Sequence, residues 1–549
     1  MRRIAYRFRA ATSKARGAMG VLARPRGDSR PRLFSRAQLG SCRRSRQSLI
    51  RLAMLIAAIL AATIATTAAT RPHYGGTLRV MLPSAPNALD LPPNATPADY
   101  WDLARTLSLV GDPLVTLDAQ GRPNPALAVA WQSDPSARHW QFTLRPGVKF
   151  HDGSAASPAA IAQILAALHS NWNVRASADS LSINSETPMP SLLAELALPR
   201  NLILKRKADA NGNGSDLPVG TGAFLVAEWQ PGKLLKLAAN EDSWEGRPFV
   251  DAVEIEFGKA LRDQAIALEL DKADVVEVAP QTPTGAPHHG ESSSLSSSLS
   301  LPVELLALGF PANSRAQDPR LREALALAID RKPIQSVLLK GAGEPAASIL
   351  PNWMTGYDAV FSAQTNPQTA RTLLADSRQP ALNLSYSLSY DPRDPQAQLI
   401  AERIALNARE VGISVQVSLS GADDIRLVRV VLPSPDPATS LSEAARQLGL
   451  PQPAFPAPRS NSSHLEDPNL DDLYQAERSL LEGYAVIPLF HLPVATAASA
   501  RVRNWAPGRM VDRLGEWSQS GPPLANVWLT DQRPGDSRSY GPQPQAGSR

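Results

Sequence analysis

Few residues of this chain have the types and the spacing that chemistry would need. His151 and Asp152 could act as a general base and the group that orients it, and His288 and His289 could bind a metal ion. Adjacent side chains in a turn seldom face one another, however, and no carboxylate or thiolate stands at ligand spacing from the second pair. We therefore interpret the first pair as a turn and the second as part of a solvated loop.

Recognised catalytic patterns do not occur in the 549 residues. The chain has no Gly-x-Ser-x-Gly turn, no His-Glu-x-x-His pair, no phosphate-binding Gly-rich loop and no dinucleotide fingerprint. Single acids such as Asp271 and Asp330 stand at the ends of expected helices and need no catalytic role. The sequence thus predicts a protein that is not an enzyme and that has no cofactor and no metal site.

The clearest structural signal is a run of turns and short extended segments from Leu117 to Gly153. Within it the sequence alternates, so that Trp140, Phe142 and Leu144 face one side of a half-buried strand. The run therefore predicts a β-rich module without catalytic residues.

The rest of the body alternates between strand and helix patterns, which indicates an α/β protein. Strands are expected over residues 77–82, 224–229, 233–239, 253–257, 274–278, 303–310, 382–388, 413–417, 426–432 and 485–492. Helices are expected over residues 98–109, 159–169, 191–196, 261–271, 319–329, 367–375, 395–410 and 469–482, with Ser157 and Asp318 as caps. Residues 281–300 are low-complexity and are expected to form an exposed loop, and residues 433–463 are rich in Pro and Ser.

Several segments in a fixed order resemble one protein family. Pro125 begins the pattern P-x-L-A-x-x-W, and Trp140 begins W-x-F-x-L-R-x-G-V-K-F-H-D-G. Further blocks begin at Tyr74 (YGGTLRV), Val219 (VGTGAF) and Asp318 (DPRLREA). Together these blocks resemble the bacterial extracellular solute-binding proteins of family 5, which supply peptides or nickel to ABC transporters.

This resemblance implies a two-lobed periplasmic binding protein of the type II, large peptide-binding class, with a hinge between the lobes and an extra domain inserted in the first lobe. The implied boundaries are 1–70 for a basic leader with a signal peptide or anchor, 71–115, 218–302 and 485–530 for lobe I, 116–217 for the inserted domain II, 303–484 for lobe II (domain III), and 531–549 for a disordered tail. The Leu117 to Gly153 stretch would then belong to the inserted domain, away from the main contacts to ligand.

The resemblance also points to four residues for the ligand site. Tyr100, Trp101 and Trp353 stand beside family blocks and could line the cavity or pack in the core. In peptide-binding relatives, an acid within a W-x-A-D-Y-x-D-P segment holds the peptide ammonium. Here Asp436 keeps the Asp-Pro pair, whereas Pro433 stands at the position of that acid and offers no charge to an ammonium.

Charge is distributed unevenly along the chain, whose formal net charge is +5 from 56 Lys and Arg and 51 Asp and Glu. Residues 1–51 hold 15 of the basic residues and a single acid, Asp28, which leaves 41 basic and 50 acidic residues and a net charge of −9 for the remainder. An acidic body of this kind is not expected to bind nucleic acid. The only cysteine, Cys42, lies in the basic segment, so the body has no disulfide and no thiolate metal site.

Residues 52–70 are nineteen uncharged residues that follow the basic segment. They fit a signal peptide cleaved near Thr67-Ala68-Ala69, or a retained anchor, since nineteen residues can just span a bilayer. Both interpretations leave residues 1–51 in the cytoplasm and the body outside. We therefore expect a periplasmic protein, or one at the outer face of the cytoplasmic membrane and bound to it through an uncleaved leader.

These observations predict the substrate-binding component of an ABC importer. It would capture a peptide or another small organic solute between its two lobes and deliver it to the permease subunits. The alternative is a membrane-anchored sensory or scaffold protein that keeps the solute-binding fold without transport, and retention of residues 52–70 in the mature protein would favour it.

Overall fold

The computed structural model describes residues 72–91, 97–118, 121–207, 217–280, 296–357, 360–361, 364–376, 385–392, 394, 396–419, 423–455, 470–504 and 526–530. By its contacts the chain divides into residues 1–71 and residues 72–549, and all described residues belong to the second unit. The leader, the His288-His289 pair and the tail from residue 531 lie outside the described residues.

An eleven-stranded sheet is the largest among the described residues. It has two parallel groups, β12-β1-β13 and β18-β16-β17, and the other neighbours are antiparallel. In order, the strands are β10 (Phe224–Gln230), β11 (Leu234–Ala239), β12 (Ala252–Glu256), β1 (Thr77–Met81), β13 (Val275–Val278), β19 (Val486–Ala498), β14 (Ser296–Gly309), β18 (Ile425–Val431), β16 (Ser385–Ser389) and β17 (Ser414–Ser418), and β15 (Glu344–Pro345) pairs with β19 at the side.

Two long strands, β14 and β19, join the parallel groups. Residues 305–309 of β14 pair both with β18 and with the first half of β19, whereas residues 296–299 pair with the end of β19, which itself pairs with β13. The register shifts on both sides of Pro302. The predicted loop over residues 281–300 is therefore wrong for residues 296–300, because backbone pairing with β19 extends the strand into the serine-rich sequence.

A second sheet of four strands has the order β4-β5-β7-β6. Its central strand β5 (His139–Leu144) confirms the predicted alternation, with Trp140, Phe142 and Leu144 buried and their neighbours exposed. We call this sheet with its covering elements the β5 module. Its other elements are β2 (Val115–Leu117), β3 (Pro123–Pro125), β4 (Ala128–Ser133), α3 (Pro158–Leu168), β6 (Asn173–Ala176), β7 (Ser180–Asn184), α4 (Leu192–Leu196), η1 (Pro199–Asn201), β8 (Lys205–Lys207) and β9 (Leu217–Val219).

Most of the remaining helices lie near their predicted positions, whereas α7, α8 and α11 were not predicted. Asp318 caps α6 through a bond from the Arg320 N–H to its carboxylate (2.9 Å), and Ser157 caps α3 through the Ala160 N–H (3.3 Å). The helices are α2 (Pro97–Ser108), α5 (Leu261–Glu269), α6 (Pro319–Ala328), α7 (Arg331–Pro333), α8 (Asn352–Thr355), α9 (Pro367–Asp376), α10 (Ala397–Glu410), α11 (Pro437–Leu448) and α12 (Leu470–Leu481), and two further short strands are β20 (Val502–Arg503) and β21 (Trp528–Leu529).

Helix α11 lies inside the Pro- and Ser-rich region, where the sequence analysis predicted no helix. Asp436 is its N-cap, Pro437 stands at the first helical position, and Gly449 ends it with φ of 68°. The two prolines before Asp436 suggested a coil, yet they only precede the helix. A cap followed by Pro was the signal for this helix.

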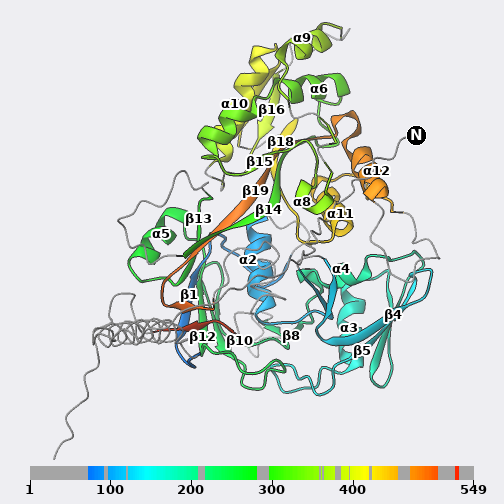
Figure 1. Ribbon diagram of the computed structural model, residues 1–549, viewed down its shortest axis with the longest axis vertical. Coiled ribbons are helices and arrows are strands. Elements are labelled where there is room, and N and C mark those ends of the chain that lie inside the picture. The colour runs from blue at the N-terminus through cyan, green and yellow to red at the C-terminus, as the bar shows by residue number, and fades with distance from the viewer. Residues whose placement is uncertain are drawn as a thin grey trace, which may run out of the picture. The chain divides into compact units, whose positions relative to one another are not determined.

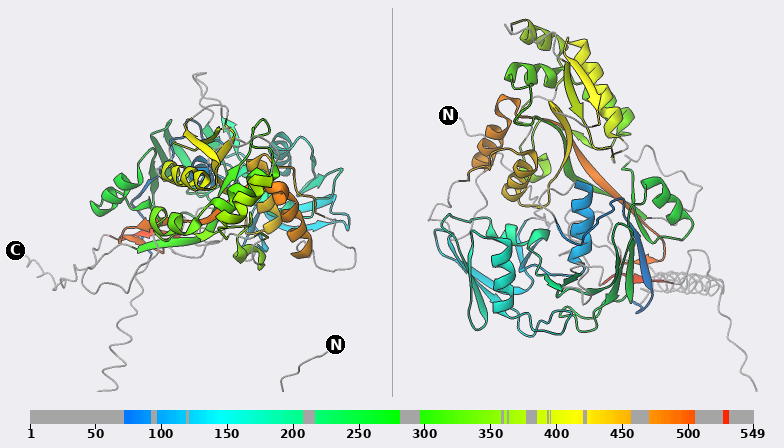
Figure 2. Two further views of the ribbon diagram at one scale, coloured as in Figure 1. Left: turned by 90° about the horizontal axis from the view of Figure 1, so that it is seen from above. Right: turned by 180° about the vertical axis from the view of Figure 1, so that it is seen from behind.

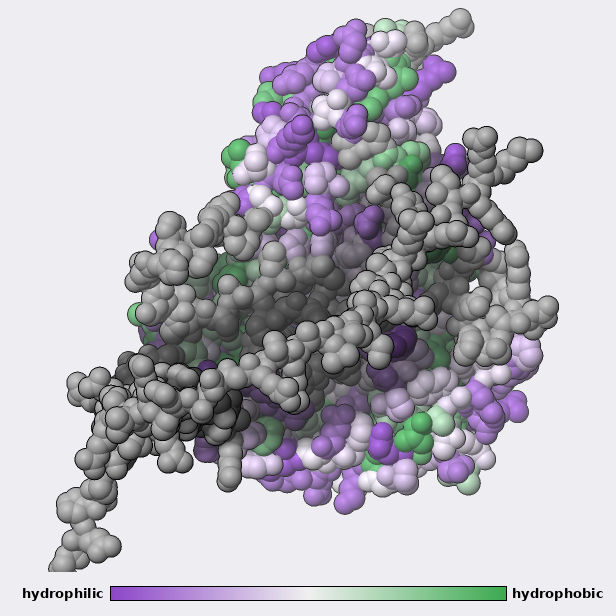
Figure 3. Space-filling model, viewed as in Figure 1, coloured by the Kyte–Doolittle hydropathy of each residue, from purple (hydrophilic) through white to green (hydrophobic). Residues whose placement is uncertain are grey.

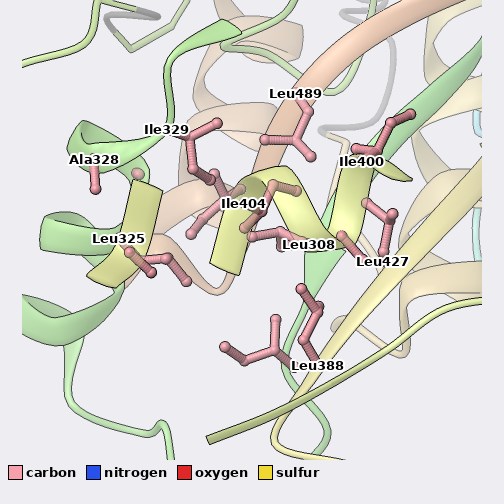
Figure 4. Packing of buried hydrophobic residues seen from close by; sticks show 14 of the residues in the cluster. Leu308, Leu325, Ala328, Ile329, Leu388, Ile400, Ile404, Leu427 and Leu489 are labelled. Carbon is pink, nitrogen blue, oxygen red and sulfur yellow. The ribbon is translucent and has the colours of Figure 1, made fainter. Parts of the chain in front are cut away.

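Buried side chains form separate hydrophobic cores. The β1 core lies between the β1 strand group and α2, the β5 core fills the β5 module, and the α11 core packs α11 and α12 against β14 and β18. The β16 core is the fourth. Figure 4 shows how Leu325 and Ile329 from α6 and its end meet Ile404 of α10 and Leu308 of β14 there.

Figures 1 and 2 show the arrangement of these parts. β14 and β19 run side by side between the two parallel strand groups, and α2 lies next to them, between the β1 strands and the β5 module. Hydrophilic residues predominate on the visible face over α9, α10 and the β5 module (Figure 3). None of the helices in the described residues is long and apolar enough to cross a membrane.

Candidate ligand-binding site

Three of the four residues predicted for the ligand site come together in one buried cluster. Tyr100 and Trp101 of α2 pack with Trp353 of α8, against Val303 of β14 and Val431 of β18. The rings of Tyr100 and Trp101 meet edge to face, with centroids 5.9 Å apart. The cluster therefore lies where α2 crosses the long strands, beside the register shifts at Pro302.

The Trp353 indole is held in place by the strand irregularity. Its Nε1 donates a hydrogen bond to the backbone carbonyl of Pro302 at 2.9 Å. Because the register shifts around Pro302, this carbonyl is available to a side chain instead of to the neighbouring strand. The bond fixes α8 against β14.

Helix α2 also carries a buried ion pair. Arg105 pairs with Glu277 of β13, and its Nη1 lies 3.6 Å from a carboxylate oxygen of Asp102. The other Asp102 oxygen accepts the backbone N–H of Ser84 at 3.0 Å. Burial, and then the charge of Glu277, raise the pKa of Asp102 to about 7, so Asp102 is partly protonated near neutral pH.

A second ion pair continues this group across the long strands. Arg429 of β18 binds Glu304 of β14 at 3.2 Å and Asp394 at 2.6 Å. Burial raises the pKa of Glu304 even though Arg429 opposes the shift, and the Glu277 charge raises it further. We call these six residues, Asp102, Arg105, Glu277, Glu304, Asp394 and Arg429, the α2 network. It has four carboxylates and two guanidinium groups.

On the other side of Tyr100, charged residues connect the β5 module to α11. Arg200 of η1 binds Glu195 of α4 at 2.5 Å and Glu443 of α11 at 2.8 Å, and Arg446 also binds Glu443, at 3.1 Å. Burial acts to raise the pKa of Glu443, but Arg446 and Arg200 outweigh it, and the net pKa is lowered. We call Glu195, Arg200, Glu443 and Arg446 the α11 network. It has two charges of each sign.

We call the region where α2, η1 and α11 approach one another the junction. Three buried polar atoms on its helices lack hydrogen-bond partners among the described residues: the Tyr100 hydroxyl, the Trp101 Nε1 and the Thr439 hydroxyl. We call them the open polar atoms. Their residues are 8%, 5% and 6% exposed. Leaving such a group buried and unsatisfied costs about 1–3 kcal/mol, so each of these atoms would gain from a hydrogen-bond partner.

Asp436, the fourth predicted residue, lies outside the aromatic cluster. Its carboxylate caps α11 by accepting the backbone N–H of Thr439 at 2.8 Å, and its own N–H donates to Ser434. The β5 module reaches this point, because a β-carbon at Gly121 would lie 3.8 Å from the Asp436 nitrogen. Asp436 therefore positions the start of α11, three residues before the open Thr439 hydroxyl.

His151 and Asp152 do not form a base with its orienting group. His151 contacts the backbone of Gly220 and Gly222, whereas Asp152 binds Lys205 at 2.9 Å, so the two side chains have separate partners. Among the described residues no group of three or more His, Cys, Asp or Glu could hold a metal ion. The junction offers hydrogen bonds and apolar surface, which suit binding.

Several residues at the junction were missed from the sequence. Arg105, Arg200, Thr439 and Glu443 come from three segments that are far apart in the chain. Asp102 and Arg105, an oppositely charged pair at i and i+3 of an expected helix, were a usable signal. No local sequence pattern predicts that η1 lies close to α11.

Comparison with known proteins identifies the family. The model of the bacterial extracellular solute-binding proteins, family 5 middle, matches residues 122–424. The chain belongs to this family.

The nickel-binding periplasmic protein of Escherichia coli is 26% identical over 351 residues, which span 58% of this chain and 66% of that protein, just under two thirds. Two solved structures superpose with TM-scores of 0.67: AgaA from A. tumefaciens R10 in complex with agropinic acid (19% identity) and the dipeptide-binding protein of Pseudoalteromonas sp. SM9913 in complex with Met-Leu (18%). Each match covers 83% of this chain, and 99% and 100% of the solved chains. These structures have the two-lobed type II fold, as predicted, and the family's members are binding proteins and not enzymes.

Proposed function

We propose that the protein is the substrate-binding component of an ABC importer, and that it captures a peptide or another small organic solute between its two lobes. Lobe I would comprise the β1 strand group with α2 and α5, and lobe II the β16 strand group with α6 and α9–α12. The boundaries given above, at about residues 302 and 485, remain part of this proposal.

The main support is the junction of α2, η1 and α11, with its aromatic cluster and three open polar atoms. These groups come from segments on both sides of the β14–β19 pair. Two long strands with register shifts at Pro302 are suited to act as a hinge, because bending there breaks few hydrogen bonds. A solute that binds both sides would stabilise the closed form.

Relatives show that this fold serves chemically different solutes. They include a nickel-binding protein and proteins in complex with agropinic acid and with the dipeptide Met-Leu. Family membership therefore supports solute binding without fixing the solute. By the same likeness we propose that the body acts in the periplasm or at the outer face of the cytoplasmic membrane, with the permease subunits as partners.

Two measurements test this function. Calorimetric titration of the full chain with peptides, nickel salts and sugars should give saturable binding for at least one class. Small-angle scattering with that compound should show a smaller radius of gyration than without it, since closure compacts the protein. No binding across all classes would contradict the proposal.

A further inference from the structure

Tyr100 and Thr439 reach one junction from two different helices. Helix α2 packs against η1, and Arg200 of η1 binds Glu443 of α11 at 2.8 Å, so α2 lies near the α11 network. The charges of Glu443 and Arg200 also act on the pKa of Tyr100. Thr439 precedes Glu443 by four residues on α11, so the two side chains share a helix face, and both are buried. In the view of Figure 1, α11 lies above α4, and α2 lies to the left of both.

The three open polar atoms define what a ligand must offer. An indole N–H can only donate a hydrogen bond, so Trp101 requires an acceptor. Burial raises the pKa of Tyr100 above its ordinary value, so its hydroxyl keeps its proton and can donate. The Thr439 hydroxyl can donate or accept. Oxygen atoms of a carboxylate, a carbonyl or a hydroxyl satisfy all three.

The carboxylates of the α11 network are already bound to cations. Arg200 and Arg446 bind Glu443, and Arg200 also binds Glu195. The Asp436 carboxylate caps α11, and Pro433 carries no charge. An ammonium group placed here would have to displace a guanidinium from a buried carboxylate, which is strongly unfavourable.

We propose, on the premise that the chain binds a solute as argued above, that this junction is a subsite for an oxygen-rich group and that no ammonium group anchors the solute. The ligand class is a small hydroxy acid, sugar acid or N-blocked acyl compound. Tyr100, Trp101 and Thr439 would bind its oxygen atoms.

Calorimetry of the full chain with two series of probes tests this assignment. The first series pairs dipeptides with their N-acetyl derivatives, and the second contains gluconate, glucuronate and glycerate. We expect saturable binding by at least one compound that has no free ammonium group. If a dipeptide binds, acetylation should not weaken it by more than a few-fold.

Two near-isosteric variants then locate the subsite. Tyr100→Phe and Thr439→Val each remove one open hydroxyl and should weaken the bound compound about tenfold. The thermal midpoint without ligand should not fall, because these hydroxyls have no partner among the described residues. Tyr386→Phe, in the β16 core and 3% exposed, is the matched control and should keep the affinity.

Three results would overturn the assignment. Loss of more than about a hundredfold in affinity on acetylation would show that an ammonium anchors the ligand, and would leave the proposed function intact. Unchanged affinity in both variants would place the ligand elsewhere. No saturable binding by either series, by nickel or by any peptide would contradict the proposed function itself.

Discussion

The α2 network and the α11 network bury charges on two sides of the same helix, but they differ in balance. The α2 network sets four carboxylates against two guanidinium groups, and the pKa values of Asp102 and Glu304 are raised by burial. The α11 network has equal numbers of each sign, and the pKa of Glu443 is lowered. The protonation of the α2 network should therefore change with pH near neutrality. The α11 network has no net charge and lies beside the open polar atoms.

Burial also separates the two networks. Arg105 is 7% exposed in the α2 network, whereas Arg200 and Arg446 of the α11 network are 35% and 40% exposed at the side chain. Water can hydrate Arg200 and Arg446 but hardly reaches Arg105, whereas Arg429, the other guanidinium of the α2 network, is 26% exposed. Breaking the α2 network should therefore cost more.

Arg105→Met should have the largest effect. It leaves Asp102 and Glu277 buried with no guanidinium on α2, and we expect the free energy of unfolding to fall by about 3–5 kcal/mol. Urea denaturation at pH 8 measures it. Arg122→Met is the control, because its pair with Asp118 is exposed and should contribute less than about 1 kcal/mol. Equal losses in the two variants would refute the importance of the buried pair.

The excess of carboxylates in the α2 network should make the free energy of unfolding depend on pH. The pKa of Asp102 rises from 3.8 to about 7 on folding, so the folded protein holds a proton that the unfolded chain releases. Stability from this group is complete below pH 4 and is lost as the pH rises to 7, by an amount on the order of 2–4 kcal/mol.

His491 acts in the opposite sense in the same range. Burial lowers its pKa to about 4, so its contribution is lost as the pH falls from about 6.5 towards 4. The wild-type slope combines these two groups with others, such as Glu245, whose pKa burial raises to about 7. The difference between Asp102→Asn and wild type isolates the aspartate. Relative to wild type, the variant should gain stability between pH 4 and pH 7. Parallel curves over that range would contradict the assignment.

Glu443→Gln should have a smaller effect than Arg105→Met. The two arginines lose a buried carboxylate but keep contact with solvent, so we expect a loss of about 1–3 kcal/mol in urea denaturation. Glu256→Gln is the control, since its pair with Lys259 is 40% exposed on each side and should contribute little. A loss as large as that of Arg105→Met would contradict the claim that the α2 network contributes more to stability than the α11 network.

Tyr100→Phe should not lower the stability of the ligand-free protein, because its hydroxyl has no partner within the described part of the chain. Removal of an unsatisfied buried group should instead raise the free energy of unfolding, by up to about 1–3 kcal/mol. Tyr357→Phe is the comparison. Its hydroxyl donates to Glu477 at 2.5 Å, and its loss should cost about 1–2 kcal/mol. Thermal unfolding of both variants checks the difference, and a clear loss in Tyr100→Phe would reveal a structural role.

Much of the fold followed from local patterns. The alternation at Trp140, Phe142 and Leu144 predicted β5, and Ser157-Pro158 and Asp318-Pro319 predicted the starts of α3 and α6. The family blocks predicted the two-lobed class. Local patterns gave the wrong prediction at residues 296–300, where pairing with a distant strand decides the structure. They also missed the start of α11 at Asp436, because the prolines around it are typical of a coil.

The site was only partly accessible from the sequence. Tyr100, Trp101 and Trp353 were named from neighbouring family blocks, and they meet in one cluster. Arg200 and Glu443 are 243 residues apart, and no local pattern brings them together. Asp436 was named as a ligand residue from an Asp-Pro pair, and in the structure its carboxylate caps α11.

The central claim is that a small solute binds beside α2 and α11, and tryptophan fluorescence tests it most directly. Titration of the full chain with a solute found by calorimetry should give a saturable change that is largely lost in Trp101→Phe. Trp140→Phe, in the β5 core, should keep the change, because this ring lies away from the junction. A change that survives in Trp101→Phe and disappears in Trp140→Phe would contradict the account.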